Sequence, residues 1–265
     1  MSSRAAETPA APALARRLEA YYTRYYRDAL GIPGWRELVA VRLDDLAYEG
    51  QRLARLEAAI ERTVDGLAVL NVGCGTGGFN AVAAKAGAAV CGVDPSGEAV
   101  AIAAARLPGG VLRAAAEDLP FADASFDLVY CYSTLEHVAD ARRATSEMVR
   151  VLRPGGLVYL HTPSRWGCFE THYKVLWLPG LPAAAQAAYL RLRRRPTAFL
   201  GTLRLSSLAE CRGLLAGAGA RVVRVLDDGA RRPVPTRAWP LIRAYYRLSG
   251  VQPHVELVAV KGARA

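Results

Sequence analysis

A glycine-rich turn between an apolar strand and a helix is the feature that most limits how this chain can fold. Residues 69–80 read VLNVGCGTGGFN, in which an apolar run enters a loop of four glycines, and small or apolar residues follow. Such loops let the backbone approach a nucleotide-like ligand closely. The turn therefore predicts an α/β fold with a nucleotide-like ligand at the end of the strand.

The segments after this turn alternate between short apolar runs and helix-like stretches. The strand-like runs AAVCGVD (88–94), FDLVYCYS (126–133) and LVYLHTP (157–163) are separated by segments with helical spacing, such as PSGEAVAIAAARL and ARRATSEMVRVL. Alternation with short turns indicates parallel strands joined by right-handed crossovers, with helices on both faces of the sheet.

The rest of the chain departs from this alternation in two places. Residues 14–62 keep apolar residues at helical spacing, so residues 1–62 are predicted to form a helical N-terminal cap. The main domain then covers residues 63–265. Residues 164–200 interrupt it with aromatic residues, prolines and arginines, and we expect this insertion to form part of a substrate site. The first residues resemble an Ala/Pro arm rather than a signal peptide.

The composition limits the cellular compartment and the classes of partner that can be expected. The net charge of +10 comes almost entirely from arginine, and no RNA-binding motif accompanies it, so a nucleic-acid partner is not favoured. Five scattered cysteines without a CxxC pair favour a reduced, cytoplasmic protein with neither disulfides nor a zinc knuckle. No metal site is therefore expected.

The glycine spacing alone leaves two cofactor classes open. Gly73, Gly75 and Gly78 satisfy G-x-G-x-x-G, and Asp94 follows Gly73 by 21 residues, which also fits a nicotinamide dinucleotide site. The motifs GCGTG, VDPS, EDLPFADASFDLVYCYSTLEHV and LRPGG occur in this order. In this combination, the chain resembles class I S-adenosylmethionine-dependent methyltransferases, especially the small-molecule subgroup that includes the ubiquinone-biosynthesis O-methyltransferases. The resemblance is strong over residues 67–163 and topological over 201–261.

This resemblance implies a Rossmann-like fold and S-adenosylmethionine as cofactor. The implied sheet is mostly parallel and seven-stranded with an antiparallel last strand, HVELVAVKG, and the insertion follows strand 5. Asp94 is expected to accept hydrogen bonds from both ribose hydroxyls, and the segment of Glu117 and Asp118 to bind adenine. The implied cofactor-binding residues are Asn71, Gly73, Cys74, Gly75, Gly77, Asp94, Pro95, Ala116, Glu117, Asp118 and Cys131.

Two positions depart from the pattern of the family. Asn71 stands where an acidic residue is usual, and Ala115 stands where close relatives often have Asp. An amide still offers an acceptor, but it lacks the negative charge that favours the ammonium and sulfonium of the cofactor. A non-catalytic relative that only binds S-adenosylmethionine therefore stays open as an alternative.

Methyl transfer to a hydroxyl needs a base, and histidines are the first candidates. His137 follows the strand that borders the transferred methyl, and His172 lies in the insertion, so both are candidate catalytic residues. His161 is a weaker candidate, and His254 is expected to be structural. Tyr21, Tyr22 and Tyr25 are further candidates if the N-terminal helices close the pocket, although packing is the simpler role for such a stripe.

The sequence therefore predicts a methyltransferase that acts on a small molecule, at a hydroxyl oxygen, and the apolar residues of the insertion leave an apolar substrate open. The alternatives are a methyltransferase of RNA or protein, which the absence of an NPPY-type motif disfavours, and the non-catalytic relative. Aromatic residues beside the arginine cluster RLRRR make 164–200 a candidate for peripheral membrane contact. The identity of the acceptor and the oligomeric state are not predicted.

Overall fold

A seven-stranded sheet forms the centre of the computed structural model, which describes residues 11–227 and 239–262. The spatial order of the strands is β3 (Val111–Arg113), β2 (Ala89–Asp94), β1 (Ala68–Val72), β4 (Phe126–Tyr132), β5 (Leu152–Pro163), β9 (His254–Lys261) and β8 (Ala220–Val225). Of these seven strands, six run in one direction and β9 runs in the opposite direction, antiparallel to both β5 and β8. The predicted Rossmann-like sheet with an antiparallel last strand is confirmed.

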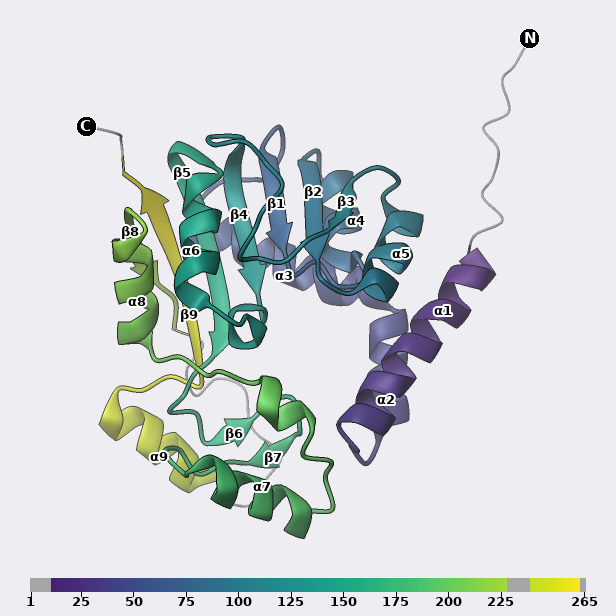
Figure 1. Cartoon of the computed structure of the whole chain (residues 1–265), viewed down its shortest axis with the longest axis vertical. Helices are drawn as coiled ribbons and strands as arrows, with labels where there is room; N and C mark the ends of the chain where they lie inside the picture. Colours follow the sequence, from purple (N-terminus) through teal and green to yellow (C-terminus); the bar gives the residue numbers. More distant parts are fainter. Residues whose placement is uncertain (1–10, 228–238, 263–265) are drawn as a thin grey trace.

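The order of the strands reverses direction between β1 and β4. The chain moves outward from β1 to β2 and β3, and then returns to place β4 on the other side of β1. Ligands of open α/β sheets bind at such a switch point, outside the carboxyl ends of the strands. In Figure 1 these ends face the insertion and the N-terminal helices.

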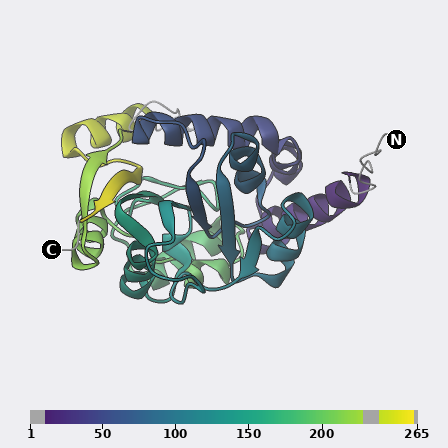
Figure 2. The ribbon, with the colours of Figure 1, turned by 90° about the horizontal axis from the view of Figure 1, so that it is seen from above.

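Helices cover both faces of the sheet, because neighbouring residues of a strand point to opposite sides. Val69 packs toward α3 (Asp45–Ile60) and α4 (Gly78–Lys85), whereas Leu70 packs toward α6 (Ala141–Arg150) and α8 (Leu208–Gly217). Helix α5 (Gly97–Arg106) packs beside β2 and β3. Figure 2 shows the layers from above. Within the described part of the chain, no helix is both long and apolar enough to cross a bilayer.

The N-terminal helices and the insertion share one apolar cluster. The first group is α1 (Ala11–Thr23), the π-helix η1 (Arg24–Ala29) and α2 (Trp35–Leu43). The insertion holds β6 (Phe169–Glu170), β7 (Val175–Leu176), α7 (Ala183–Leu192) and η3 (Phe199–Thr202). Tyr22 and Tyr26 from the first group pack with Tyr173 and Trp177 from the insertion. Two segments about 150 residues apart therefore form a single lobe beside the carboxyl ends of the strands.

Several details differ from the sequence-based expectation. Within residues 14–62, where apolar residues keep helical spacing throughout, the helix that begins at Trp35 ends at Leu43 and the next begins at Asp45, because Asp44 has non-helical dihedral angles, φ −94° and ψ 54°. Helix α9 (Trp239–Ser249), for which no element was predicted, has Ile242 and Tyr246 buried one turn apart. The first ten residues, interpreted above as an arm, and residues 228–238 lie outside the described residues.

The side chains of the insertion divide between interior and surface. Trp177 and Tyr173 are buried, whereas Leu178 and Leu192 are 67% and 81% exposed. The aromatic side chains thus serve mainly the shared lobe, and the membrane contact expected of this segment stays a prediction.

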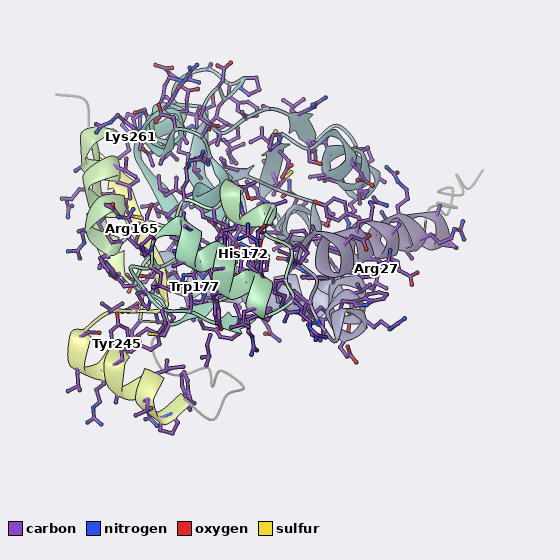
Figure 3. All side chains as sticks on the ribbon, turned by 60° about the horizontal axis from the view of Figure 1, so that its bottom comes forward. Arg27, Arg165, His172, Trp177, Tyr245 and Lys261 are labelled. Carbon is purple, nitrogen blue, oxygen red and sulfur yellow. The ribbon has the colours of Figure 1, made fainter. Side chains whose placement is uncertain are left out.

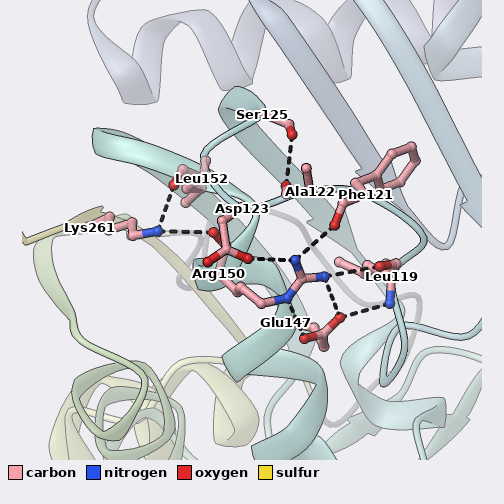
Figure 4. Close-up of polar contacts among 9 residues, drawn as sticks. All are labelled: Leu119, Phe121, Ala122, Asp123, Ser125, Glu147, Arg150, Leu152 and Lys261. Atoms are coloured by element: carbon pink, nitrogen blue, oxygen red, sulfur yellow. Dashed lines mark hydrogen bonds and ion pairs between the residues drawn. The ribbon is translucent and has the colours of Figure 1, made fainter.

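Arg150 anchors the loop that precedes β4. Its guanidinium donates to the carbonyl oxygens of Leu119 and Phe121 and forms ion pairs with Asp123 and Glu147 (Figure 4). Lys261, at the end of β9, donates to the carbonyl oxygens of Arg150 and Leu152. These bonds hold the loop 119–123 in place between the third and fourth parallel strands.

Candidate active site

A cavity of about 710 Å³ lies at the carboxyl ends of β1, β2, β4 and β5, under the N-terminal helices and the insertion. This volume is within the range typical of small-molecule sites. The cavity is lined by eight of the residues expected from the sequence, namely Asn71, Gly73, Cys74, Gly75, Asp94, Pro95, His137 and His172. The two expected groups, cofactor-binding and catalytic, therefore share one cavity.

The glycine loop between β1 and α4 is shaped by its contacts with both neighbouring strands. The amides of Gly73 and Cys74 donate to the carbonyl oxygen of Val93, at 2.8 and 2.9 Å. Gly73 has a φ of +74°, and a Cβ on it would lie 2.1 Å from Thr134 Oγ1. That hydroxyl donates to the carbonyl oxygen of Val72. Gly73 is thus required both by its backbone conformation and by the close approach of the loop after β4.

Asp94 joins the glycine loop to the start of α5. Its Oδ2 accepts from the amide of Gly75 and its Oδ1 from the amide of Ser96, each at 2.9 Å. Burial raises the pKa of Asp94, although the two amide donors act in the opposite direction. Each carboxylate oxygen has a further lone pair. The side chain lines the cavity, so it can accept two hydroxyl donors from a ligand there.

Asn71 lies at the floor of the cavity and is held by a second amide. Its Nδ2 donates to Asn80 Oδ1 at 2.6 Å, and both residues are buried. The amide oxygen of Asn71 is the group left for a ligand. The position therefore presents a neutral acceptor where the related family usually has a carboxylate.

Five of the expected cofactor-binding residues lie outside the cavity lining. Cys131 points to the opposite face of the sheet and is completely buried, and Ala116 belongs to the same cluster. Glu117 Oε1 accepts from the amide of Ala139, and Asp118 is exposed. A Cβ on Gly77 would lie 2.8 Å from that of Ala103, so Gly77 allows α4 and α5 to pack closely.

Tyrosines of the N-terminal helices form one wall of the cavity. Tyr21, Tyr22, Tyr25 and Tyr26 all line it. The hydroxyl of Tyr22 lies 2.8 Å from Thr76 Oγ1, in a buried hydrogen bond to the glycine loop. Burial raises the pKa of Tyr21 to about 12 and raises that of Tyr25 further. These phenols therefore stay protonated near neutral pH and serve as walls and donors rather than as bases.

Two arginines share one carboxylate beside these tyrosines. Glu49 is 5% exposed and accepts from Arg52 Nη1 at 3.0 Å and from Arg42 Nη1 at 3.5 Å. The Arg52 guanidinium also lies 3.7 Å from the ring centroid of Tyr132. With two guanidinium charges and one carboxylate, this wall of the cavity carries an excess of positive charge.

Four ionisable side chains gather on the opposite wall. His172 Nδ1 lies 2.7 Å from Glu170 Oε1, and His172 Nε2 lies 3.7 Å from Glu136 Oε1. The rings of His137 and His172 are 5.2 Å apart, and Phe199 packs against both. Figure 3 shows His172 and Trp177 among the side chains of the insertion. We refer to Glu136, His137, Glu170 and His172 as the histidine–glutamate cluster.

Burial and mutual contact shift the pKa values within this cluster. Complete burial raises the pKa of Glu136 to about 7, against the opposing effect of His172. Burial lowers the pKa of His137 to about 4. Burial would also lower the pKa of His172, but the hydrogen bond to Glu170 and the charges of Glu170 and Glu136 raise it overall. His137 is therefore neutral near pH 7, with a lone pair on one ring nitrogen.

The two other histidines line the cavity away from this cluster. The His161 ring stacks on that of Tyr132, with centroids 3.9 Å apart, and the His254 ring lies 4.9 Å from that of His161. His161 is 5% exposed. Both rings thus pack in an aromatic column at the ends of β5 and β9.

The acidic half of the cluster and the arginine pair were not predicted from the sequence. Glu136 directly precedes His137, and Glu170 precedes His172 by two residues, so the pairs EH and ETH were a local signal. That the two pairs meet was not visible, because about 35 residues of chain separate them. Arg42 and Arg52 occur in ordinary amphipathic helices, and nothing local distinguishes them.

The central part of the sequence matches known proteins. Residues 70–160 match a methyltransferase domain family. An uncharacterized methyltransferase of Mycobacterium sp. (strain JLS) is 44% identical over 117 residues, which are 44% of this chain and 46% of that protein. A ubiquinone biosynthesis O-methyltransferase of Rhizobium etli (strain CIAT 652) is 34% identical over 129 residues, which cover 44% of this chain and 52% of that protein. The chain thus spans about half the length of these curated relatives.

Solved structures agree in fold over more of the chain. An S-adenosylmethionine-dependent methyltransferase from Thermotoga maritima aligns with 94% of this chain and all of its own, with a TM-score of 0.53 and 21% identity. One from Mesorhizobium loti aligns with 75% of this chain and 92% of its own, with a TM-score of 0.52 and 22% identity. At these identities the likeness concerns the fold alone.

Proposed function

Since this chain contains a class I S-adenosylmethionine-dependent methyltransferase domain, we propose that it transfers a methyl group to a hydroxyl of a small molecule. The observation that carries the proposal is the shared cavity. The glycine loop and Asp94 line it, and so do His137 and His172 of the histidine–glutamate cluster. A cofactor and an acceptor can therefore meet in one cavity.

The residues at the first end fit S-adenosylmethionine, which supplies an electrophilic methyl group on a sulfonium. Gly73 and Gly75 line the cavity without side chains, so a ligand can contact their backbone directly. At Gly73 a side chain is also excluded, because a Cβ there would overlap Thr134. Asp94 keeps free lone pairs for the two ribose hydroxyls. The amide of Asn71 offers an acceptor but no charge, so we expect the ribose contacts to contribute most of the polar affinity.

The residues at the second end suit a hydroxyl acceptor. Glu170 fixes the ring of His172, while Tyr173 N donates to the other oxygen of Glu170 at 2.5 Å. His172 in turn packs against His137, whose neutral ring offers the lone pair of one nitrogen to the hydroxyl and favours its deprotonated form. Orientation and exclusion of water supply the remaining acceleration.

The walls between the two ends favour a planar, largely apolar acceptor. Tyr25, Tyr132 and Phe199 line this part of the cavity. Tyr25 and Phe199 pack edge to face, with centroids 5.8 Å apart, and present ring surface to a ligand. The name of the Rhizobium relative refers to O-methylation in ubiquinone biosynthesis, which is consistent with an aromatic hydroxyl.

Cofactor binding is tested by calorimetry with S-adenosylhomocysteine. Asp94→Ala removes both predicted hydroxyl contacts, and we expect the affinity to fall at least about 100-fold, since each hydrogen bond to a charged group contributes about 1.5–3 kcal/mol net. Glu98→Ala is the matched control, because Glu98 is an exposed carboxylate four residues along the same βα unit and does not line the cavity.

Catalysis is tested by mass spectrometry with a panel of phenols, catechols, amines and thiols. A mass gain of one methyl group on a phenol or catechol supports the proposal. Methylation of amines alone would reject the hydroxyl. Binding of S-adenosylhomocysteine with no transfer to any acceptor would favour the non-catalytic alternative, which Asn71 and Ala115 keep open.

A further inference from the structure

Three potential metal-ligating side chains converge at one wall of the cavity, where His137 and His172 line it and Glu136 is buried. The carboxylate of Glu136 and the ring nitrogens of His137 and His172 offer ligand atoms that all lie within 4.8 Å of one another. Two ligands bound to one zinc ion at ordinary bond lengths lie about 3.4 Å apart. The 3.7 Å between Glu136 Oε1 and His172 Nε2 is already close to that separation.

The contacts behind these ligands orient them as a metal site requires. The Nδ1–H of His172 donates to Glu170 Oε1, which leaves the lone pair of Nε2 directed at Glu136. A ligating histidine commonly donates its second ring nitrogen to a carboxylate in this way. Glu136 is held similarly, since Thr162 Oγ1 donates to its Oε2 at 3.0 Å.

The remaining oxygen of Glu136 has no hydrogen-bond donor among the residues that the structure describes, although the residue is completely buried. A buried acceptor without a donor is costly, and a second lone pair facing it adds to the cost. A cation between Glu136 and His172 would satisfy both atoms at once.

We infer that Glu136, His137 and His172 bind a divalent transition-metal ion. Two imidazole nitrogens and one carboxylate oxygen suit zinc, manganese or iron, whereas magnesium and calcium prefer all-oxygen sites. Three protein ligands leave coordination positions open. His137 and His172 both line the cavity, so the open positions face the acceptor. Glu170 is a positioning residue that acts through His172.

The effect of the ion on the reaction rests on the proposed function, whereas its binding does not. A hydroxyl coordinated to the ion would lose its proton more readily, as zinc lowers the pKa of bound water to about 7. The proton leaves to water, and the oxygen keeps the electron pair that forms the new bond to the methyl carbon. The bond between that carbon and the sulfonium sulfur breaks, and S-adenosylhomocysteine leaves with the electron pair of the broken bond. On a five- or six-coordinate ion, an acceptor with two adjacent oxygens would fill two of the open positions, so a catechol is the substrate class that fits best.

The experiment titrates the tag-free full-length protein, stripped of metal with a chelator, with Mn²⁺ and Zn²⁺ in a calorimeter. We expect about one equivalent of metal to bind per chain. Glu136→Gln and His172→Ala should each lower the affinity at least tenfold, and Glu170→Gln should lower it about 10- to 100-fold, as is typical for a residue behind a ligand. His161→Ala is the matched control, since His161 is a cavity histidine outside the cluster.

Two results would overturn the inference. One is no binding of either metal at millimolar concentration, which would mean that a proton shared between Glu136 and His172 holds the cluster together. The other is metal binding that Glu136→Gln leaves unchanged. Titration of the same variants with S-adenosylhomocysteine reports their folding, and the mass-spectrometric transfer assay tests the proposed function separately, so failure of one proposal is distinguishable from failure of the other.

Discussion

The two ends of the cavity are built in different ways. The cofactor end consists of backbone from two consecutive βα units, ordered by short bonds such as Gly75 N to Asp94 Oδ2 at 2.9 Å. The acceptor end consists of side chains from α1 to α3, the segment after β4, and the insertion. Backbone geometry tolerates few sequences, whereas a wall of side chains can change one residue at a time. The difference explains why the cofactor can be inferred from an ordered series of sequence motifs and the acceptor cannot.

The two ends also differ in the free-energy cost of the groups that they bury. Gly73 and Asp94 lie in the ordinary strand-to-helix connections of the fold. By contrast, the acceptor end buries Glu49 and Glu136, and the charge of a buried carboxylate must be balanced by a partner or removed by a proton. Costly buried groups that the fold itself does not require are typical of functional sites.

The largest expected effect is a loss of turnover, from a substitution that changes the acceptor end and leaves the cofactor end intact. His172→Ala should lower turnover about 10²- to 10⁴-fold, the usual contribution of a group that controls a proton in the transition state. The affinity for S-adenosylhomocysteine should stay within about twofold, because the affected wall lies at the acceptor end. Single-turnover kinetics and calorimetry on the same preparation measure the two quantities.

His161→Ala serves as the control for this prediction. Its ring stacks on Tyr132 outside the histidine–glutamate cluster, so we expect turnover to fall less than about tenfold. Equal losses in both variants would mean that the two histidines act through general packing of the cavity.

The next largest effect is expected from a substitution in the glycine loop at the cofactor end, which should lower the free energy of unfolding. Gly73→Ala adds a Cβ that would lie 2.1 Å from Thr134 Oγ1, at a φ of +74°. We expect a loss of about 2–4 kcal/mol in the free energy of unfolding, from left-handed strain and overpacking together. Denaturant unfolding with and without S-adenosylhomocysteine measures the change and the accompanying loss of affinity.

Gly109→Ala is the control that separates the cost of left-handed backbone strain from the cost of steric overlap with Thr134. Gly109 has a φ of +75°, but a Cβ added there would meet no atom within 4 Å, so only the left-handed conformation is penalised. We expect Gly109→Ala to lower the free energy of unfolding by about 1 kcal/mol. If Gly73→Ala lowers the free energy of unfolding no more than Gly109→Ala does, the loop after β4 moves to accommodate the added methyl group.

The smallest expected effect concerns the contact that joins the two ends. Tyr22→Phe removes the hydrogen bond to Thr76 Oγ1 and keeps the ring. We expect a loss of about 0.5–1.5 kcal/mol, the usual net value of one hydrogen bond. Thermal unfolding measures it. A larger loss of cofactor affinity than of stability would mean that the N-terminal helices close over the bound cofactor.

Sequence patterns were most informative where structure is local. The turn at Gly73 and the alternation of strands and helices were predicted correctly, because each follows from periodicity or from a motif of a few residues. The antiparallel β9 was predicted correctly from the resemblance to a known family. The break at Asp44 was missed, since apolar spacing continues across it. Helix α9 was missed because prolines and arginines obscured the buried pair Ile242 and Tyr246.

The sequence by itself determined the parallel sheet and the glycine loop with its aspartate, because their chemistry depends on neighbours along the chain. Only the tertiary structure decided which ionisable groups face the acceptor. Glu136 and His172 meet because an insertion folds back across the ends of β4 and β5, against helices from the other end of the chain. Pairing over such distances depends on how apolar surfaces of separate segments fit together, which no local pattern records.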